Sequence, residues 1–281
     1  MSRGIKGQII KINSDLHYVS YKDDIHPCKC RGIFRKNKII PLVGDYVIFD
    51  KDKEVIEEIL PRKNEFNRPK VSNIDRAFLI TSLVHPDFSL NLLDKLIVLM
   101  ELSNVEPIIC ITKEDLVSKK ELEDIYSKLD YYKSIGYKVV SNTDLGSIEK
   151  LLKNKTSVFT GQTGAGKSTL LNKLNPNWNL ETGEVSLALG RGRHTTRVVE
   201  MFELFGGKVM DTPGFSALDF NKFNKEDIKN AFIEFKEYPC PFKDCMHTNE
   251  EECLVKKAVK DNNILESRYN NYLNFIKKDV K

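Results

Sequence analysis

The segment GQTGAGKST, at residues 161–169, matches the pattern G-x-x-x-x-G-K-[ST] at every fixed position. It lies between TSVFT, an apolar run of strand length, and STLLNKL, which has helical spacing. Glycines let such a loop turn its backbone N–H groups toward phosphate oxygens, and the helix adds the positive end of its dipole. A glycine-rich turn could match by chance, but the flanking strand and helix favour a phosphate-binding loop. We expect nucleotide contacts from Gly161, Gln162, Thr163, Gly164, Ala165, Gly166, Lys167, Ser168 and Thr169.

A second motif of this kind, DTPG at residues 211–214, follows the apolar run GGKVM. An acid at a strand end beside a phosphate-binding loop is suited to hold Mg²⁺, so we assign that role to Asp211 together with the Ser168 hydroxyl. The backbone N–H of Gly214 is then expected to sense the γ-phosphate, which Lys167 also reaches. These residues are candidates for the catalytic site.

Between the two motifs lies GRGRHTTR, at residues 190–197. A loop rich in Gly, Arg and Thr can order around phosphate and Mg²⁺, and Thr195 or Thr196 is able to complete the metal shell of a switch segment. The alternative is a surface loop whose arginines touch nothing. The position between two phosphate motifs favours the switch.

The segment TKED, at residues 112–115, follows the strand-like run VEPIICI and is similar to the N/T-K-x-D motif of guanine-nucleotide-binding proteins. The Asp115 carboxylate can accept hydrogen bonds from N1–H and the amino group of guanine, whereas adenine would leave it unpaired. A charged helix start is the alternative, and the place at the end of a parallel strand favours base recognition. The expected base-binding residues are Thr112, Lys113, Glu114 and Asp115, with a backbone contact from the segment Val140, Ser141 and Asn142.

The order of these motifs is unusual, because the base motif precedes the phosphate loop. Thr112 lies 49 residues before Gly161 (161 − 112). In most GTPases the base motif comes second, so this order is that of a circularly permuted GTPase. The pocket can survive the permutation because the motifs need only meet at strand ends.

The wider pattern predicts three domains. Short β-rich runs such as GQIIKI, LHYVSY, CRGIF and DYVIFD predict an OB-fold barrel at 1–64, followed by a linker at 61–70. Strands then alternate with helices, which predicts an α/β domain with a mostly parallel sheet and helices on both faces at 65–220. Helical spacing returns over 221–281, in KEDIKNAFIEF and in a final stretch at 253–278.

The six cysteines are unevenly placed, and three of them lie close to a histidine. We read them as a metal site rather than as disulfides, because three thiolates and one imidazole complete the tetrahedral shell of a structural zinc ion. The expected zinc ligands are Cys240, Cys245, His247 and Cys253. No run approaches the roughly 20 apolar residues of a membrane span, and no secretory signal is evident. We expect a cytoplasmic protein without a membrane partner.

The net charge of +4 comes mainly from the N-terminal segment, since residues 1–70 carry 15 Lys and Arg against 10 Asp and Glu. The stretch 29–38 holds five basic residues, no acid and one aromatic, Phe34. This composition is typical of a loop that binds nucleic acid. A solvated basic face is the alternative, and charge alone does not separate the two.

Taken together, the basic barrel, the order TKED, GQTGAGKST, DTPG, the GRGRHTT loop and the cysteine cluster resemble the RsgA (YjeQ) family of small ribosomal subunit biogenesis GTPases. The resemblance implies GTP hydrolysis with Mg²⁺, a structural Zn²⁺, binding of GTP and GDP, and binding to the 30S subunit and its 16S rRNA late in maturation. It also implies release after hydrolysis. We expect a monomer.

The residue after the DTPG motif is Phe215, where Ras-like enzymes carry the glutamine that orients the attacking water. An apolar side chain cannot do this. His194, beside the threonines of the switch loop, is the candidate substitute, and an exposed loop histidine is the alternative. Two other functions stay open at this stage: a P-loop switch with a protein partner and no role on RNA, and a non-catalytic RNA- or zinc-binding adaptor.

Overall fold

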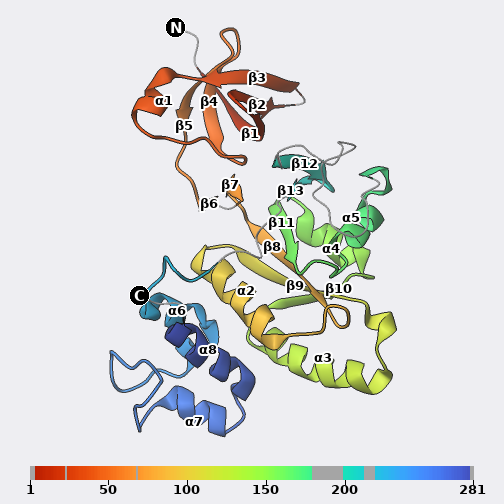
Figure 1. Ribbon diagram of the computed structural model, residues 1–281, viewed down its shortest axis with the longest axis vertical. Coiled ribbons are helices and arrows are strands. Elements are labelled where there is room, and N and C mark those ends of the chain that lie inside the picture. The colour runs from red at the N-terminus through yellow and green to blue at the C-terminus, as the bar shows by residue number, and fades with distance from the viewer. Residues whose placement is uncertain (1–3, 23, 68, 179–198, 212–218, 279–281) are drawn as a thin grey trace.

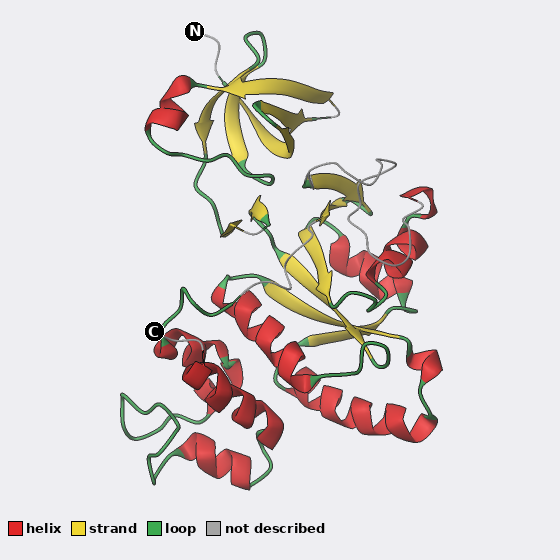
Figure 2. Ribbon diagram, viewed as in Figure 1, coloured by secondary structure: helices red, strands yellow, loops and turns green. Residues whose placement is uncertain are grey.

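The computed structural model describes residues 4–22, 24–67, 69–178, 199–211 and 219–278. Three parts lie in order along the long axis of the molecule: an N-terminal barrel, a central sheet flanked by helices, and a C-terminal group of helices (Figure 1). Figure 2 shows that strands dominate the barrel, whereas helices surround the central sheet and form most of the C-terminal part. This architecture confirms the predicted α/β class with an N-terminal OB-type barrel.

Five strands form the barrel: β1 (Ile5–Asn13), β2 (Leu16–Tyr21), β3 (Asp24–Cys30), β4 (Tyr46–Asp50) and β5 (Val55–Ile59). Strand β1 pairs with β2 and β4, and β5 pairs with β3 and β4, so the sheet closes on itself. Successive side chains of a strand project to opposite faces, so about every second residue enters the core. The buried core consists of Ile9, Val19, Cys28, Phe34, Val47, Phe49 and Ile56.

Two sequence predictions in this region are wrong. The segment CRGIF is not a strand, because β3 ends at Cys30 and helix α1 occupies Gly32–Lys36. Phe34 is only 6% exposed and packs in the barrel core, so tertiary packing overrides the strand propensity of the segment.

The predicted linker at 61–70 also differs from expectation, since its described residues contribute to a hairpin of β6 (Glu65–Asn67) and β7 (Lys70–Ser72). Its Phe66 lies opposite Val71, and both are buried. The burial of this cross-strand pair explains why the segment is not a free linker.

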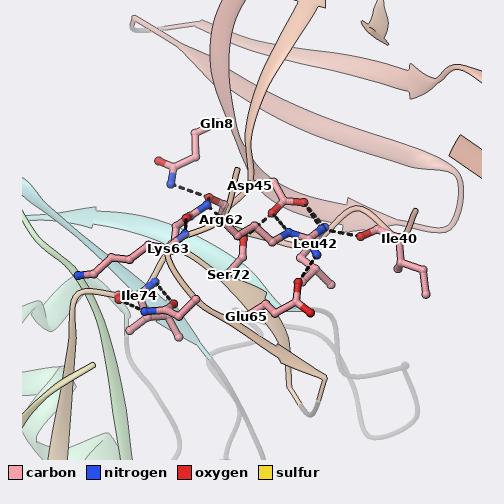
Figure 3. A network of polar contacts seen from close by, with 12 residues as sticks. Gln8, Ile40, Leu42, Asp45, Arg62, Lys63, Glu65, Ser72 and Ile74 are labelled. Carbon is pink, nitrogen blue, oxygen red and sulfur yellow. Dashed lines mark hydrogen bonds and ion pairs between the residues drawn. The ribbon is translucent and has the colours of Figure 1, made fainter. Parts of the chain in front are cut away.

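A buried carboxylate fastens the barrel to this hairpin (Figure 3). Asp45 is fully buried and accepts hydrogen bonds from Arg62 Nε at 2.7 Å and from Ser72 Oγ at 2.6 Å. The backbone N–H of Leu42 donates to the same carboxylate at 2.8 Å. Because the charge of Asp45 is both paired and hydrogen-bonded, its burial holds the two segments in one arrangement.

The central sheet has the strand order β10-β9-β8-β11-β13-β12. Its strands are β8 (Arg76–Ser82), β9 (Glu106–Thr112), β10 (Lys138–Ser141), β11 (Thr156–Gly161), β12 (Glu200–Leu204) and β13 (Gly207–Asp211). All neighbours run parallel except β12, which is antiparallel to β13. The strands predicted from VEPIICI, TSVFT and GGKVM are confirmed to within two residues at either end, whereas β12 is not predicted.

The barrel and the central sheet are joined edge to edge. Strand β1 pairs with β12 at Lys11 and Glu200, whose ammonium and carboxylate groups lie 2.9 Å apart. Lys208 of β13 donates to the Gln8 side chain of β1 at 2.7 Å. As a result, 11 strands of the part of the chain that the structure describes form one continuous sheet.

Helices cover both faces of the central sheet, as predicted for a parallel sheet. Those that flank it are α2 (Leu90–Leu102), α3 (Lys119–Ser134), α4 (Leu145–Leu152) and α5 (Lys167–Leu174). Residues of α2 and α3 share one buried cluster with Leu79 of β8, while residues of α4 and α5 share another with Phe78 and Ile80. The alternation along β8 therefore divides the core into two layers.

The C-terminal part contains α6 (Lys225–Ala231), α7 (Leu254–Lys260) and α8 (Glu266–Lys278), so the predicted helical stretch at 253–278 is two helices. Arg268 of α8 is fully buried and donates to Asp94 of α2 at 2.7 Å and to Glu234. Tyr132 of α3 and Asn271 of α8 each donate to Asp94, both at 2.7 Å. This polar group attaches the C-terminal helices to the central part.

Replacing Arg268 by methionine should lower the free energy of unfolding by about 3–5 kcal/mol, because Asp94 and Glu234 would remain buried without their cation. Urea unfolding followed by circular dichroism measures this loss. The matched control is Arg35→Met, since Arg35 pairs with Asp15 on the surface and should contribute below about 1 kcal/mol. Equal unfolding curves for the two variants would contradict the proposed role of Arg268.

Candidate nucleotide site and metal cluster

The phosphate-loop motif lies at the carboxyl edge of the sheet, between β11 and α5. A Cβ atom on Gly161 would lie 2.3 Å from the Ile80 carbonyl oxygen, so this position requires glycine. Gly166 directly precedes α5 and has a φ of +96°, and glycine adopts this positive φ without strain. Ala165 is buried, Lys167 and Ser168 are half-buried, and the residues 162–164 are exposed. The loop therefore has a packed base and an accessible rim.

The base motif lies against this loop. Thr112 ends β9 and is buried, and its hydroxyl donates a hydrogen bond to the Ala165 carbonyl oxygen at 2.6 Å. The two residues are 53 positions apart in the chain. The structure thus brings the two motifs together at one edge of the sheet, as the permuted order requires.

Lys113 has a left-handed backbone with φ at 61°, and its ammonium group donates to the carbonyl oxygens of Val84, at 3.2 Å, and His85. These two belong to the loop between β8 and α2, which sequence reasoning did not include in the site. The available signal was the His-Pro pair at 85–86, directly after the apolar run AFLITSLV. The same loop lies close to Gly164, whose Cβ position would be 3.9 Å from the His85 oxygen.

Glu114 and Asp115 occupy a short 3₁₀ turn, Glu114–Leu116. The Asp115 side chain is exposed, whereas Glu114 accepts hydrogen bonds from the hydroxyls of Tyr126 and Ser141. The backbone N–H of Asn142 donates to the Ile111 carbonyl oxygen at 2.8 Å. The loop after β10 is therefore attached to the end of β9.

Asp211 is the last residue of β13, which runs parallel to β11 with Met210 in register with Val158. Its backbone therefore ends next to the strand that leads into the phosphate loop. Four further predicted residues, His194, Thr195, Thr196 and Gly214, lie outside the described residues.

The four predicted metal ligands converge, with ligand atoms that all lie within 4.8 Å of one another. Nδ1 of His247 is 3.3 Å from Sγ of Cys245, 3.4 Å from that of Cys253 and 3.5 Å from that of Cys240. Burial raises the pKa of the Cys245 thiol, and a bound cation would favour its thiolate form. These residues can hold one metal ion.

Two supporting side chains of this cluster escaped sequence reasoning, because neither lies in a recognisable motif. The Glu250 carboxylate accepts hydrogen bonds from the backbone N–H groups of Met246 and Thr248, both at 2.7 Å. Tyr269 donates to the His247 carbonyl oxygen at 2.6 Å. Both interactions fix the backbone on either side of the imidazole.

The basic stretch 29–38 differs from expectation in one respect. All five of its Lys and Arg residues are exposed, but Phe34 is buried and cannot stack on a base. Its neighbour Ile33 is 52% exposed instead. Any contact with a polyanion here therefore depends on charge rather than on aromatic stacking.

Comparison with known proteins identifies the family. A model of the RsgA GTPase matches residues 59–221, and a model of the RsgA N-terminal domain matches residues 6–56. The chain belongs to the RsgA GTPase family. As an RsgA family member it is a GTP-hydrolysing enzyme, and its motif order is the circularly permuted one. No helix among the described residues has both the length and the apolar character to cross a bilayer.

Relatives of the RsgA family match along almost the whole chain. Small ribosomal subunit biogenesis GTPase RsgA 2 of Oceanobacillus iheyensis is 46% identical over 281 residues, which cover 96% of this chain and 96% of that protein. The RsgA protein of Bacillus subtilis strain 168 is 44% identical over 286 residues, with the same coverage of both chains. The crystal structure of YloQ, a circularly permuted GTPase, has a TM-score of 0.84 and 39% identity and covers 99% of this chain and 95% of that one. YjeQ from Thermotoga maritima has a TM-score of 0.84 at 33% identity, with 96% of each chain covered.

Proposed function

We propose that this chain binds GTP with Mg²⁺ at the carboxyl edge of its central sheet and hydrolyses it during late maturation of the 30S ribosomal subunit. The observation that carries the proposal is the hydrogen bond from Thr112 to the Ala165 carbonyl, because it joins the base motif to the phosphate loop. The role on the small subunit follows from the relatives, which are named small ribosomal subunit biogenesis GTPases.

In this proposal different residues along the edge of the sheet bind the phosphates, Mg²⁺ and the base. Backbone N–H groups of residues 162–166 and the Lys167 ammonium bind the phosphates, and Ser168 and Asp211 hold Mg²⁺. Asp115 reads the N1–H and amino group of guanine. The exposed positions of Asp115 and of residues 162–164 support these assignments, since a ligand can reach them.

The cysteine cluster is proposed to hold one structural zinc ion. In a tetrahedral site, bond lengths of about 2.3 Å to sulfur and 2.0–2.1 Å to nitrogen place two sulfurs about 3.8 Å apart and sulfur about 3.6 Å from nitrogen. Cys240 and Cys253 have their Sγ atoms 3.7 Å apart, close to this value. With four protein ligands no position is left for water, so the zinc stabilises the fold rather than takes part in hydrolysis.

The basic barrel is proposed to contact 16S rRNA through the exposed cations of residues 29–38. A factor of this kind acts in the cytoplasm, and we propose that it does so as a monomer that binds GTP or GDP in turn and leaves the subunit after hydrolysis.

The decisive experiment measures GTP turnover by the purified protein, alone and with isolated small subunits, with ATP and large subunits as controls. Strong stimulation that needs both GTP and small subunits supports the whole proposal. Turnover of GTP without stimulation would keep the enzyme and remove the ribosomal partner. Absence of GTP binding would overturn the assignment of the site.

His194 is proposed to orient the attacking water, since Phe215 cannot. His194→Ala should lower turnover stimulated by the small subunit by about 100-fold or more, within the range of general acid–base contributions, and leave the Kd for GTP nearly unchanged. Single-turnover hydrolysis with saturating subunits measures this. Stimulated turnover that survives His194→Ala would remove the assignment.

A further inference from the structure

Glu114 is one of the expected base-binding residues, but it occupies the open position of the T-K-x-D pattern, so the pattern gives it no specific chemistry. Its half-buried carboxylate accepts hydrogen bonds from the Tyr126 hydroxyl of α3 and from the Ser141 hydroxyl at the end of β10. One side chain therefore ties together the turn after β9, the helix α3 and the loop after β10.

The loop after β10 is itself braced around the same hydroxyl. Ser141 Oγ lies 2.8 Å from Thr143 Oγ1 and accepts the backbone N–H of Thr143 at 3.2 Å. Between these two residues, Asn142 donates its backbone N–H to the Ile111 carbonyl oxygen of β9. Burial and the contact with Glu114 raise the pKa of Tyr126, so its hydroxyl remains a donor at any physiological pH.

We propose that Glu114 is a positioning residue for base selection, which fixes the turn that carries Asp115 against the loop 141–143. The inference rests on the proposed role of Asp115 as the reader of guanine. A carboxylate discriminates guanine well only when it meets N1–H and the 2-amino group together, and this needs a fixed orientation. Glu114 supplies the orientation from behind the turn, because its own oxygens already accept two hydroxyl donors.

The expected result follows from this geometry. Glu114→Ala removes the acceptor for both hydroxyls, and we expect the Kd for GDP to rise about tenfold, the size of one lost charged hydrogen bond. The ratio of the Kd values for IDP and GDP should fall as well, because inosine lacks the 2-amino group that a well-oriented Asp115 recognises.

Glu114→Gln provides the rescue. Its amide keeps one carbonyl acceptor, and a hydroxyl can rotate to accept from the NH₂ group, so affinity and the IDP-to-GDP ratio should return close to those of the parent protein. Glu123→Ala, which removes an exposed carboxylate from α3, the helix that carries Tyr126, is the matched control. Tyr126→Phe combined with Glu114→Ala tests whether the two act as a unit, in which case their effects are not additive.

The experiment is isothermal titration of GDP, IDP and ADP into each variant of the full chain, with thermal unfolding to confirm that each is folded. A Glu114→Ala variant that keeps the parent IDP-to-GDP ratio overturns the inference, even if its stability drops. Asp115→Ala separates this from the proposed function. If Asp115→Ala binds GDP like the parent, the proposed base contact is wrong. If Asp115→Ala loses affinity while Glu114→Ala does not, the base contact stands and the role of Glu114 is removed.

Discussion

Replacing Lys167 by alanine is expected to lower GTP turnover by at least about 100-fold, the range in which single charge-stabilising groups act. Lys167 is the first residue of α5 and follows the left-handed Gly166. In the proposed function its ammonium group binds the phosphates. Charge spreads over the γ-phosphate oxygens in the transition state, and loss of a fixed cation there raises the barrier. Phosphate release under saturating GTP, with and without small subunits, measures the effect.

The matched control is Lys173→Ala, which removes an exposed lysine from the last turn of the same helix. Turnover of this variant should stay within about twofold of the parent, because its charge lies away from the phosphate end. Comparable loss in both variants would mean that α5, rather than the Lys167 cation, is responsible. Full turnover in Lys167→Ala would place phosphate stabilisation elsewhere.

Removal of the metal is expected to unfold the C-terminal part around the cysteine cluster. Structural zinc contributes about 10 kcal/mol or more to the folding of small domains, and the loop between Cys240 and Cys253 contains no long helix or strand of its own. Cys245→Ser should therefore lose the bound metal and loosen the packing around Phe235 and His247, which are both buried. Metal content per chain and limited proteolysis, compared with the parent, measure both effects.

Cys30→Ser serves as the control, since Cys30 lies in the barrel away from the cluster and should leave the metal content unchanged. A Cys245→Ser chain that retains one metal per molecule would contradict the assigned ligand set. Retention of the metal with altered proteolysis would instead indicate that Cys245 packs the fold without binding the ion.

The sequence predicted the central sheet well because its strands are continuous apolar runs that end at motifs. VEPIICI ends at the base motif, TSVFT ends at the phosphate loop, and both lie at the predicted edge. The convergence of the cysteine cluster could be predicted for a similar reason. Close spacing in the sequence keeps the side chains of Cys240, Cys245, His247 and Cys253 near one another in the fold.

Local sequence patterns could not predict the contacts between distant segments of the chain. Nothing near Arg268 indicates that it is fully buried against Asp94, which lies 174 positions earlier. Phe34 was predicted to lie in an exposed basic loop. Its burial depends on the closure of the barrel, which cannot be inferred from its neighbours in the sequence. The loop at 83–86 offered only its His-Pro pair as a signal, and it enters the site through Lys113 and through its approach to Gly164.

The place of β11 in the sheet has a consequence for how the chain is made. This strand lies between β8 and β13, yet Gly161 is synthesised 79 residues after Ser82 (161 − 82). At about 5–20 residues per second, one edge of β8 stays without its native partner for about 4–16 s of translation. The base motif is therefore complete on the nascent chain well before the phosphate loop, and cellular GTP can begin to stabilise the fold only after both have left the synthesising ribosome.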